Sequence, residues 1–226
     1  MRLGKFSAAG LLLLTALAVR ARYPDDDSVS PTPRKGIAHM TDPIQLVAVI
    51  GSLRKGSLNR IVFEAATELV PEGSTLAEVP VADVPFFDGD LEGDDEPAAV
   101  VALKDAVRRA DGLLFFTPEY NLSVPAVTKN ALDWLSRPFG EGAISGTPTS
   151  IVAASPGGRG GQGVRESLGL SASILTDRWY PDTLGIGSVG DAISNGRLTD
   201  PDVRATLTEW LDRFVAHARG EEVAAS

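Results

Sequence analysis

The chain has 226 residues, of which 43% are hydrophobic, and its 21 Lys and Arg stand against 30 Asp and Glu. A hydrophobic fraction of this size can build a core, so the chain as a whole is not disordered. The absence of cysteine excludes disulfides, thiolate nucleophiles and Cys-ligated metal centres. With only His39 and His217, a Ser-His-Asp triad or a multi-His metal site has almost nothing to build from. The net charge of −9 disfavours a nucleic-acid binder, and an enzyme of this composition would take its chemistry from a cofactor.

The N-terminal segment differs in composition from the rest of the chain. Arg2 and Lys5 precede an apolar run over residues 8–19, and residues 16–18 have the small-x-small pattern of a cleavage site. These features are typical of a signal peptide, and the run is short for a membrane span, which takes about 20 apolar residues. The segment that follows is rich in Pro, Asp and Ser, which indicates an unstructured linker.

A second interpretation of the N-terminus is the one we favour. Met40 stands directly before the first apolar strand, so we predict that the protein starts there and that residues 1–39 are an extension from a mis-assigned start. On this interpretation the protein is cytoplasmic, and export by a signal is the alternative. The domain organisation that we predict is an extension over 1–39, one domain over 40–220 and a tail over 221–226.

Apolar periodicity in the body of the chain alternates between two types of segment. Continuous apolar runs, such as IQLVAVI at residues 44–50, indicate strands that are buried on both faces. Strands are predicted at residues 44–50, 75–81, 112–116, 149–154 and, interrupted, within 179–186. Apolar residues that recur every three or four positions indicate amphipathic helices. Helices are predicted at residues 59–69, 98–110, 126–135, 164–175 and 203–218.

This alternation of strands and helices determines the predicted fold class. It is typical of an α/β protein with a parallel sheet covered by helices on both faces, and the crossovers in such sheets are right-handed. For five strands we predict a doubly wound sheet in the order 2-1-3-4-5. In that order the ligand crevice lies at the carboxyl ends of strands 1 and 3, so the loops after these strands are the candidate binding segments.

The loop after strand 1, GSLRKGSLN at residues 51–59, has the composition of an anion site. It offers two serine hydroxyls, the cations Arg54 and Lys55, and Asn59 at the start of a helix. Backbone amides at a helix N-terminus bind phosphate, so a phosphate monoester fits this loop. A nucleoside triphosphate does not fit, because Ser57 and Leu58 replace the Lys and Ser/Thr of a Walker A motif. The alternative is a simple turn in which Asn59 caps the helix.

The loop after strand 3, TPEYNLSVP at residues 117–125, contains two prolines that restrict its shape. The side chains of Glu119, Tyr120 and Asn121 would project from it into the same crevice. A planar heteroaromatic ligand with donors and acceptors along one edge needs a rigid polar wall of this kind. The alternative is an ordinary strand-to-helix turn in which Tyr120 packs and Asn121 caps the next helix.

Together the two loops resemble the NADPH-dependent FMN reductase family of flavodoxin-like quinone, chromate and azo-dye reductases. The resemblance is carried by GSLRKGSLN and by TPEYNLSVPAVTKNALDWLSRP, and it extends from about residue 44 to the last helix. It implies that the FMN phosphate is surrounded by Ser52, Arg54, Ser57, Leu58 and Asn59. It implies that the isoalloxazine and ribityl chain are lined by Pro118, Glu119, Tyr120 and Asn121. A third segment, after strand 4, would contribute Ser155, Gly157 and Gly158.

The activity that the resemblance implies is FMN-dependent oxidation of NADPH or NADH. Hydride would pass to flavin N5, and the electrons would then reduce quinones, azo or nitro compounds, free flavins or oxidised metal ions in the same site, with ping-pong kinetics. No catalytic side chain and no metal ligand is assigned, because the flavin carries the chemistry. The expected partners are small-molecule acceptors, without nucleic acid or stable membrane insertion, and the resemblance implies a homodimer or homotetramer.

Two other classes of protein remain as alternatives. A flavodoxin-type electron carrier would use the acidic surface to dock redox partners and would not oxidise NAD(P)H itself. Against it, the first loop lacks the Thr-rich phosphate turn that is typical of such carriers. A protein that descends from this family but has a regulatory or structural role would bind no flavin.

Three further features admit functional interpretations that we do not favour. Residues 158–163 match G-x-G-x-x-G, with Asp177 about 20 residues further on, but the NAD fingerprint belongs to the first strand–helix turn. The acidic segment over residues 83–96 lacks the order of an EF-hand and is better explained as a solvated loop. His217 is expected at the surface or favoured by a helix dipole, and Trp134 is expected to pack, with a subunit contact as one alternative.

Overall fold

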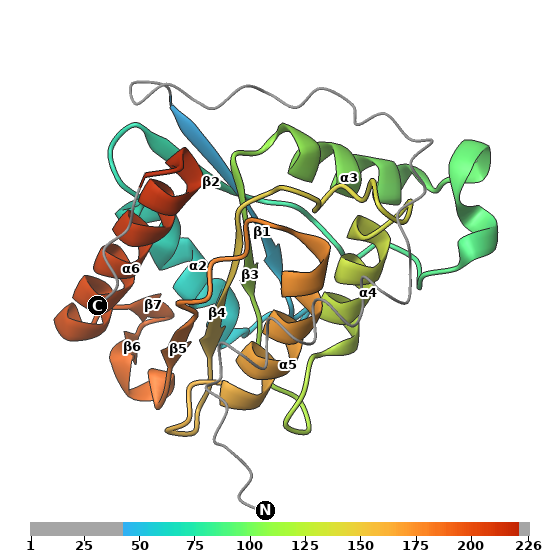
Figure 1. The fold of residues 1–226 in the computed structure, drawn as a ribbon. Coiled ribbons are helices and arrows are strands. Elements are labelled where there is room, and N and C mark those ends of the chain that lie inside the picture. Colours follow the sequence, from blue (N-terminus) through green and yellow to red (C-terminus); the bar gives the residue numbers. More distant parts are fainter. Residues whose placement is uncertain (1–42, 222–226) are drawn as a thin grey trace, which may run out of the picture. The chain divides into compact units, whose positions relative to one another are not determined.

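The computed structural model describes residues 43–221, and Figure 1 shows this part of the chain as alternating strands and helices. The expectations for residues 1–39, including the choice of start and the compartment that follows from it, concern residues outside that range. The strands of the main sheet are β1 (Ile44–Ile50), β2 (Ser74–Glu78), β3 (Gly112–Phe116), β4 (Thr149–Ala154) and β5 (Leu184–Ile186). The helices are α2 (Leu58–Leu69), α3 (Ala98–Arg109), α4 (Ala126–Leu135), α5 (Gln162–Leu175) and α6 (Pro201–Arg219).

The main sheet is parallel and has the strand order β2-β1-β3-β4-β5, which confirms the predicted fold class and order. β1 and β3 end in register, since Ile50 pairs with Phe116, and Phe116 pairs in turn with Val152 near the end of β4. Every residue of β3 and β4 is buried, as expected for strands covered on both faces. The loops that follow β1, β3 and β4 therefore emerge at one edge of the sheet.

Each face of the sheet has its own hydrophobic core. Helices α2 and α6 cover one face, and helices α3, α4 and α5 cover the other (Figure 1). Side chains of β1 alternate between the two cores, so that Leu46 and Ile50 face α2 and α6 whereas Val49 faces the other helices. Trp134 on α4 is fully buried in the second core, which confirms its expected packing role.

β3 and β4 have the predicted bounds, whereas β2 and β5 are shorter than predicted. β2 stops at Glu78 instead of residue 81, because Pro80 has no N–H with which to continue the ladder. β5 is restricted to Leu184–Ile186, and Trp179, at the start of the predicted range, forms only an isolated bridge with Thr149. The helix ends differ from the predicted ones by no more than two residues.

A hairpin after β5 is absent from the sequence prediction. It consists of β6 (Ile193–Ser194) and β7 (Arg197–Leu198), and it follows a short 3₁₀ helix, η3 (Val189–Ala192). Asn195 and Gly196 join the two strands and both have positive φ, at 50° and 74°. Asn-Gly is the strongest sequence signal for such a turn, so this hairpin could have been predicted from the sequence.

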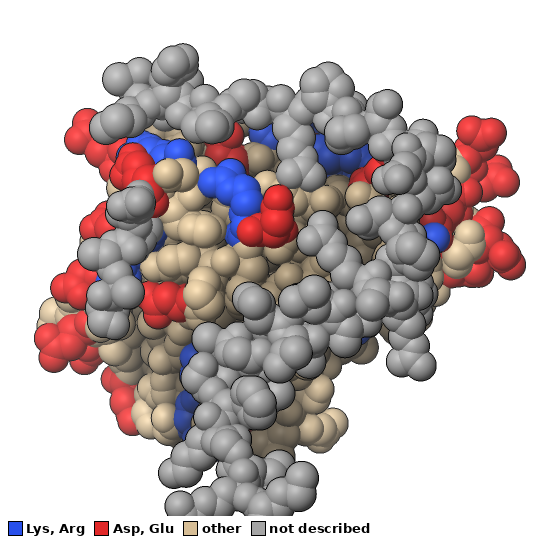
Figure 2. Space-filling view, viewed as in Figure 1, with Lys and Arg blue, Asp and Glu red and all other residues tan. Residues whose placement is uncertain are grey.

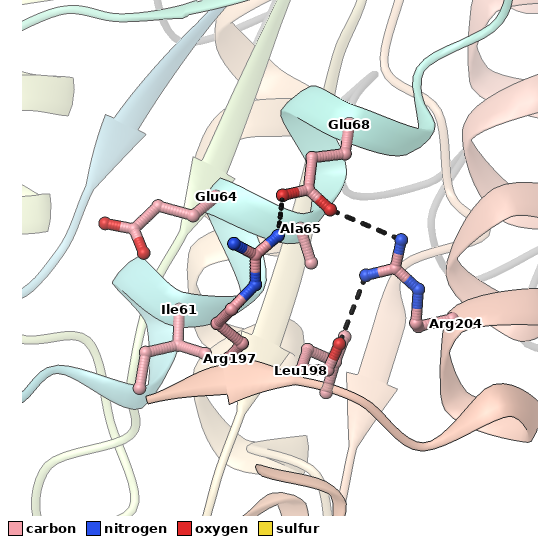
Figure 3. A pocket seen from close by; sticks show the side chains of 7 residues that line it. All are labelled: Ile61, Glu64, Ala65, Glu68, Arg197, Leu198 and Arg204. Carbon is pink, nitrogen blue, oxygen red and sulfur yellow. Dashed lines mark hydrogen bonds and ion pairs between the residues drawn. The ribbon is translucent and has the colours of Figure 1, made fainter. Parts of the chain in front are cut away.

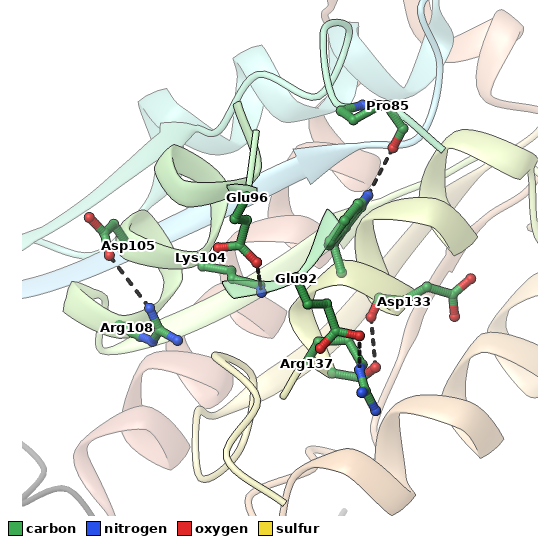
Figure 4. A network of polar contacts seen from close by, with 10 residues as sticks. Pro85, Glu92, Glu96, Lys104, Asp105, Arg108, Asp133 and Arg137 are labelled. Carbon is green, nitrogen blue, oxygen red and sulfur yellow. Dashed lines mark hydrogen bonds and ion pairs between the residues drawn. The ribbon is translucent and has the colours of Figure 1, made fainter. Parts of the chain in front are cut away.

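The acidic loop between β2 and α3, which contains the short helices η1 (Gly89–Leu91) and η2 (Gly93–Asp95), is fastened to the helices beneath it (Figure 4). Trp134 Nε1 donates a hydrogen bond to the carbonyl of Pro85 at 2.8 Å, and the buried Lys104 pairs with Glu96. The exposed acids of this loop lie over η1 and η2, at the right of Figure 2. No group of three or more His, Asp or Glu side chains within residues 43–221 could hold a metal ion.

Helix α6 ends in an aromatic cluster beside the start of β4. The ring of His217 lies 4.9 Å from that of Tyr180, and Arg178 donates to the carbonyls of His217 and Ala218. Burial lowers the pKa of His217 below its ordinary value and favours the neutral ring. His217 is thus half-buried in the last turn of α6, and burial opposes the charge that the helix dipole was expected to favour, while Arg178 occupies the last carbonyls. No helix within the described range is long and apolar enough to cross a membrane.

We expect His217 to make the stability of the fold depend on pH. Its pKa is lowered in the folded state, so the unfolded chain binds the proton more readily. The free energy of unfolding should therefore be highest above about pH 6.5, the ordinary pKa of histidine, and fall as the pH drops below it. Urea denaturation between about pH 7.5 and pH 5.5 measures this change, above the range in which carboxylates titrate.

The variant His217→Gln provides the control, because glutamine can still donate to the carbonyl of Arg178 and does not titrate. It should flatten the profile in this pH range. A pH dependence equal to that of the original chain would show that other groups are responsible.

Candidate functional site

Three loops leave the carboxyl edge of the sheet, and they contain every residue that the sequence suggested for the site. We call them the first loop (residues 51–59), the second loop (residues 117–125) and the third loop (residues 155–161). Backbone hydrogen bonds keep their starting points together, since Gly51 N–H donates to Phe116 at 2.8 Å and Thr117 N–H donates to Val152 at 3.0 Å. The three segments therefore meet where the strand order reverses between β1 and β3, which is the usual ligand crevice of such sheets.

The first loop begins with a glycine because no side chain fits at that position. A Cβ atom on Gly51 would lie 2.2 Å from Oγ1 of Thr128 and 2.5 Å from Oγ1 of Thr117. These two buried hydroxyls are hydrogen-bonded to each other at 2.9 Å. The first turn of α4 and the second loop therefore touch the backbone of the first loop. Sequence reasoning missed this contact, because nothing in the spacing of Thr128 marks it as a neighbour of Gly51.

The start of α2 is fixed by a helix cap and an ion pair. The hydroxyl of Ser57 accepts the N–H of Arg60 at 3.3 Å, so Ser57, and not Asn59, is the residue that caps the helix. The guanidinium of Arg60 forms a bidentate pair with Glu78 at 2.7 and 2.8 Å, and this pair lowers the pKa of Glu78. Arg60 is thereby directed toward β2 and away from a ligand of the first loop.

Asn59 connects α2 to the end of β4. Its Oδ1 accepts the N–H of Ala154 at 2.9 Å, and its Nδ2 donates to the carbonyl of the same residue at 3.0 Å. Asn59 is only 2% exposed, so its amide serves the backbone at the point where the third loop begins. The structure thus gives Asn59 a bracing role, and a direct contact with a ligand stays a prediction.

Several hydrogen-bond donors of the first loop are unused. Ser52 is 5% exposed, yet its hydroxyl makes no hydrogen bond within the described chain. Arg54 and Lys55 are exposed and have no ion pair with any residue between 43 and 221. Leu58 and Asn59 belong to the first turn of α2, where backbone N–H groups have no partner inside the helix. This set of donors and positive charges suits a phosphate group.

The second loop contains a tight turn that presents an aromatic side chain. Tyr120 and Ser123 exchange two backbone hydrogen bonds at 3.1 and 3.0 Å. Between them Asn121 and Leu122 have positive φ, at 52° and 61°, a strained conformation for leucine. Tyr120 is 50% exposed and Pro125 occupies the cap position of α4, so neither part of the ordinary-turn interpretation holds.

Glu119 ties the second loop to α5. Its Oε2 accepts the N–H of Val164 at 3.1 Å, in the first turn of that helix. A Cβ atom on Gly163 would lie 2.8 Å from the same oxygen, so only glycine permits the approach. A carboxylate at a helix N-terminus is also favoured by the helix dipole. The neighbouring Pro118 is half-buried and accepts a hydrogen bond from Oγ1 of Thr117 at 3.1 Å.

The third loop is open on its outer side. Gly157 and Gly158 are exposed, and a Cβ atom on either would meet nothing within 4 Å. Gly160 and Gly161 have positive φ, at 54° and 62°, and lead the chain into α5. The hydroxyl of Ser155 donates to the carbonyl of Gly157 at 2.8 Å, so this serine stabilises the loop itself.

These observations fit a flavin mononucleotide. The unpaired donors of the first loop suit its phosphate, and the polar second loop and the open third loop suit a planar ring system. The fold and the site therefore define a flavodoxin-like α/β protein with a candidate FMN site at the strand-order reversal.

Comparison with known proteins agrees with this class. The family described as NADPH-dependent FMN reductase matches residues 44–190. A quinone reductase of Pseudomonas putida is 38% identical over 179 residues, covering 78% of this chain and 96% of that protein. An NAD(P)H-dependent FMN reductase of Pseudomonas aeruginosa is 41% identical over 176 residues, covering 76% and 94%. The solved structure of FerB, a flavoenzyme NAD(P)H:(acceptor) oxidoreductase of Paracoccus denitrificans, has a TM-score of 0.72 at 28% identity, over 80% of this chain and 100% of that one.

The chain belongs to the NADPH-dependent FMN reductase family. It is an FMN-dependent NAD(P)H oxidoreductase, which confirms the family resemblance of the two motifs and the cofactor that it implied. The G-x-G-x-x-G match at residues 158–163 lies across the third loop and the start of α5, in the fourth strand unit, as expected for a chance match. The roles of the individual residues in the three loops stay predictions.

We expect Asn59→Ala to weaken both the fold and FMN binding. The substitution leaves the buried N–H and carbonyl of Ala154 without their Asn59 partner. We expect this to lower the free energy of unfolding of the apoprotein by about 1–3 kcal/mol. The third loop should shift as a result and bind flavin less tightly. Urea denaturation of the apoprotein and fluorescence titration with FMN measure the two effects.

Thr67→Ala is the control on the same helix, since the Thr67 hydroxyl is exposed and bonds only to the carbonyl of Glu64. It should change little. If Asn59→Ala weakened FMN binding while the apoprotein kept its normal stability, Asn59 would be a direct ligand and not a brace.

Proposed function

We propose that the chain reduces quinones and related small-molecule acceptors at the carboxyl edge of its sheet, with FMN held by the three loops. The observation that carries this proposal is the set of unused donors on the first loop, which consists of the hydroxyl of Ser52 and the cations Arg54 and Lys55. The activity named for the Pseudomonas putida relative supports quinones as acceptors.

The first loop would bind the phosphate of the cofactor, and the second and third loops would together line its ring and ribityl chain. The phosphate would be bound or supported by Ser52, Arg54, Ser57, Leu58 and Asn59. The ring and the ribityl chain would be lined by Pro118, Glu119, Tyr120, Asn121, Ser155, Gly157 and Gly158. Asn59 and Glu119 would act from behind the site, because their side chains are bonded to Ala154 and Val164.

The chemistry that bound FMN supplies is hydride acceptance from NAD(P)H and electron donation to a second substrate. The net reaction would convert NAD(P)H, a quinone and one proton into NAD(P)⁺ and a hydroquinone. The chain would contribute binding and orientation, with Tyr120 exposed at the crevice and open space beside Gly157 and Gly158. His217 lies beside the start of β4, at the opposite edge of the sheet, so the proton would come from water.

An absorbance spectrum of the purified protein tests the proposal most directly. We expect a yellow protein whose visible flavin absorbance is bleached by NADPH without oxygen and restored by a quinone. A colourless protein that takes up no FMN would overturn the proposal. A flavin that binds but is not reduced by NADPH or NADH would indicate an electron carrier.

We expect Arg54→Gln to weaken FMN by about 10- to 150-fold, because a hydrogen bond to a charged group contributes about 1.5–3 kcal/mol. Arg108→Gln is the matched control, since Arg108 lies on α3 and pairs only weakly, at 3.6 Å, with Asp105. Equal FMN affinities of the two variants would remove Arg54 from the phosphate site.

We expect ping-pong kinetics, because one crevice at the three loops would serve NAD(P)H and the acceptor in turn. Double-reciprocal plots against NADPH at several quinone concentrations should be parallel. Intersecting lines would mean that both substrates bind together, which contradicts a single shared crevice.

We further propose that the protein forms a homodimer or homotetramer. This proposal is supported by large apolar side chains that remain exposed. They include Leu122 in the second loop and Leu170 and Ile174 on α5. Clusters of exposed apolar side chains mark sites of protein association. Sedimentation velocity of the purified protein distinguishes these assemblies from a monomer.

A further inference from the structure

Three cations at the carboxyl edge of the sheet form no ion pair within the described part of the chain. They are Arg54 and Lys55 on the first loop and Arg159 on the third loop. Arg60, which lies close by in the sequence, is already paired with Glu78. In a chain with a formal net charge of −9, unpaired cations on two neighbouring loops are a local excess of positive charge.

Arg165 also lies beside the third loop, but its guanidinium is occupied. Its Nε donates to the carbonyl of Gly160 at 3.1 Å, and its NH1 donates to Oγ1 of Thr183 at 3.2 Å. A Cβ atom on Gly185 would lie 2.7 Å from its NH2, so the group is packed against β5. Arg165 therefore holds the third loop in place and leaves Arg159 as the cation of this loop that faces solvent.

Arg159 has the properties of a ligand-binding residue rather than a structural one. It is exposed, and its guanidinium makes no hydrogen bond or ion pair with residues 43–221. Gly157 and Gly158 precede it and border open space, whereas Gly160 behind it is anchored by Arg165. The backbone next to Arg159 is thus fixed in position. All the N–H donors of the Arg159 guanidinium stay available to an anion.

We infer that Arg159 binds the 2′-phosphate of NADPH and makes NADPH the preferred electron donor. This inference rests on the proposed function, since it assigns a partner to the same crevice. FMN has one phosphate, for which the first loop already supplies Arg54 and Lys55. NADPH brings a second, separate phosphate on its adenosine, where NADH has only a hydroxyl. A guanidinium binds such a phosphate through paired charge-assisted hydrogen bonds and gains much less from a hydroxyl.

Steady-state kinetics with NADPH and NADH test the inference. We expect Arg159→Gln to raise KM for NADPH by about 10- to 100-fold while KM for NADH changes less than threefold, about the uncertainty of such contributions. Arg159→Lys should recover part of the NADPH preference, because it keeps the charge but loses the planar fork. Arg109→Gln is the matched control, since Arg109 is an exposed cation on α3 that pairs at 3.6 Å with Asp105.

A binding measurement separates recognition from turnover. Isothermal titration calorimetry of the FMN-loaded protein would use 2′,5′-ADP and 5′-AMP as probes, which differ only in the 2′-phosphate. We expect the original chain to bind 2′,5′-ADP more tightly than 5′-AMP, and Arg159→Gln to lose that difference.

Three results would overturn the inference and leave the proposed function intact. They are equal KM values for NADPH and NADH in the original chain, an equal rise of both KM values in Arg159→Gln, and an unchanged preference for 2′,5′-ADP in that variant. An equal rise would place Arg159 on the pyrophosphate that both nucleotides share. Failure of the original chain to bind FMN or to oxidise either nucleotide would instead overturn the proposed function itself.

Discussion

The two hydrogen bonds between Asn59 and Ala154 are the contact on which the geometry of the site depends. Asn59 lies in the first turn of α2, which follows β1, whereas Ala154 ends β4, and β3 lies between these two strands. The bonds therefore reach past the end of β3 and hold the first loop against the start of the third loop. Because both groups of Ala154 are buried, neither bond can be given up to water at low cost.

Polar side chains also hold the other two loops in position, through contacts with neighbouring backbone and side chains. Glu119 holds the second loop to α5, and Arg165 holds the third loop to the β5 region. Glycines permit these close approaches, as at Gly163 beside Glu119. Side chains that face the crevice, such as Tyr120, therefore project from a backbone whose conformation is fixed before a ligand binds. Such preorganisation reduces the conformational cost of binding.

The fold could be predicted from the sequence, and with it the place where the three candidate loops meet, because both depend on local patterns. The continuous apolar run at residues 44–50 specifies a strand buried on both faces, and the strand order then places the loops after β1 and β3 at one edge. The partner of Asn59 could not be predicted in this way, since Ala154 is 95 residues further along the chain. The sequence placed Asn59 in the candidate site, but only the structure shows that its amide bonds to the backbone of Ala154.

The environment of His217 also depends on a contact that is distant in the sequence. Its place near the end of α6 favoured a charged ring at the helix dipole, yet the carbonyls there are taken by Arg178, which is 39 residues away in the sequence. Position within a helix is visible in the sequence, whereas competition for the same carbonyls depends on tertiary packing.

The distribution of charge gives the site its chemical character. Acids outnumber bases in this chain, and many of its cations are held by neighbouring carboxylates, as Arg60 is by Glu78 and Lys104 by Glu96. Those cations serve the fold and contribute little field at the surface. The cations on the first and third loops have no such partners among the described residues, so their field is concentrated where the strands end. On the proposed assignment, this local field would attract the phosphates of a flavin and a nicotinamide nucleotide to one edge of a protein that is acidic as a whole.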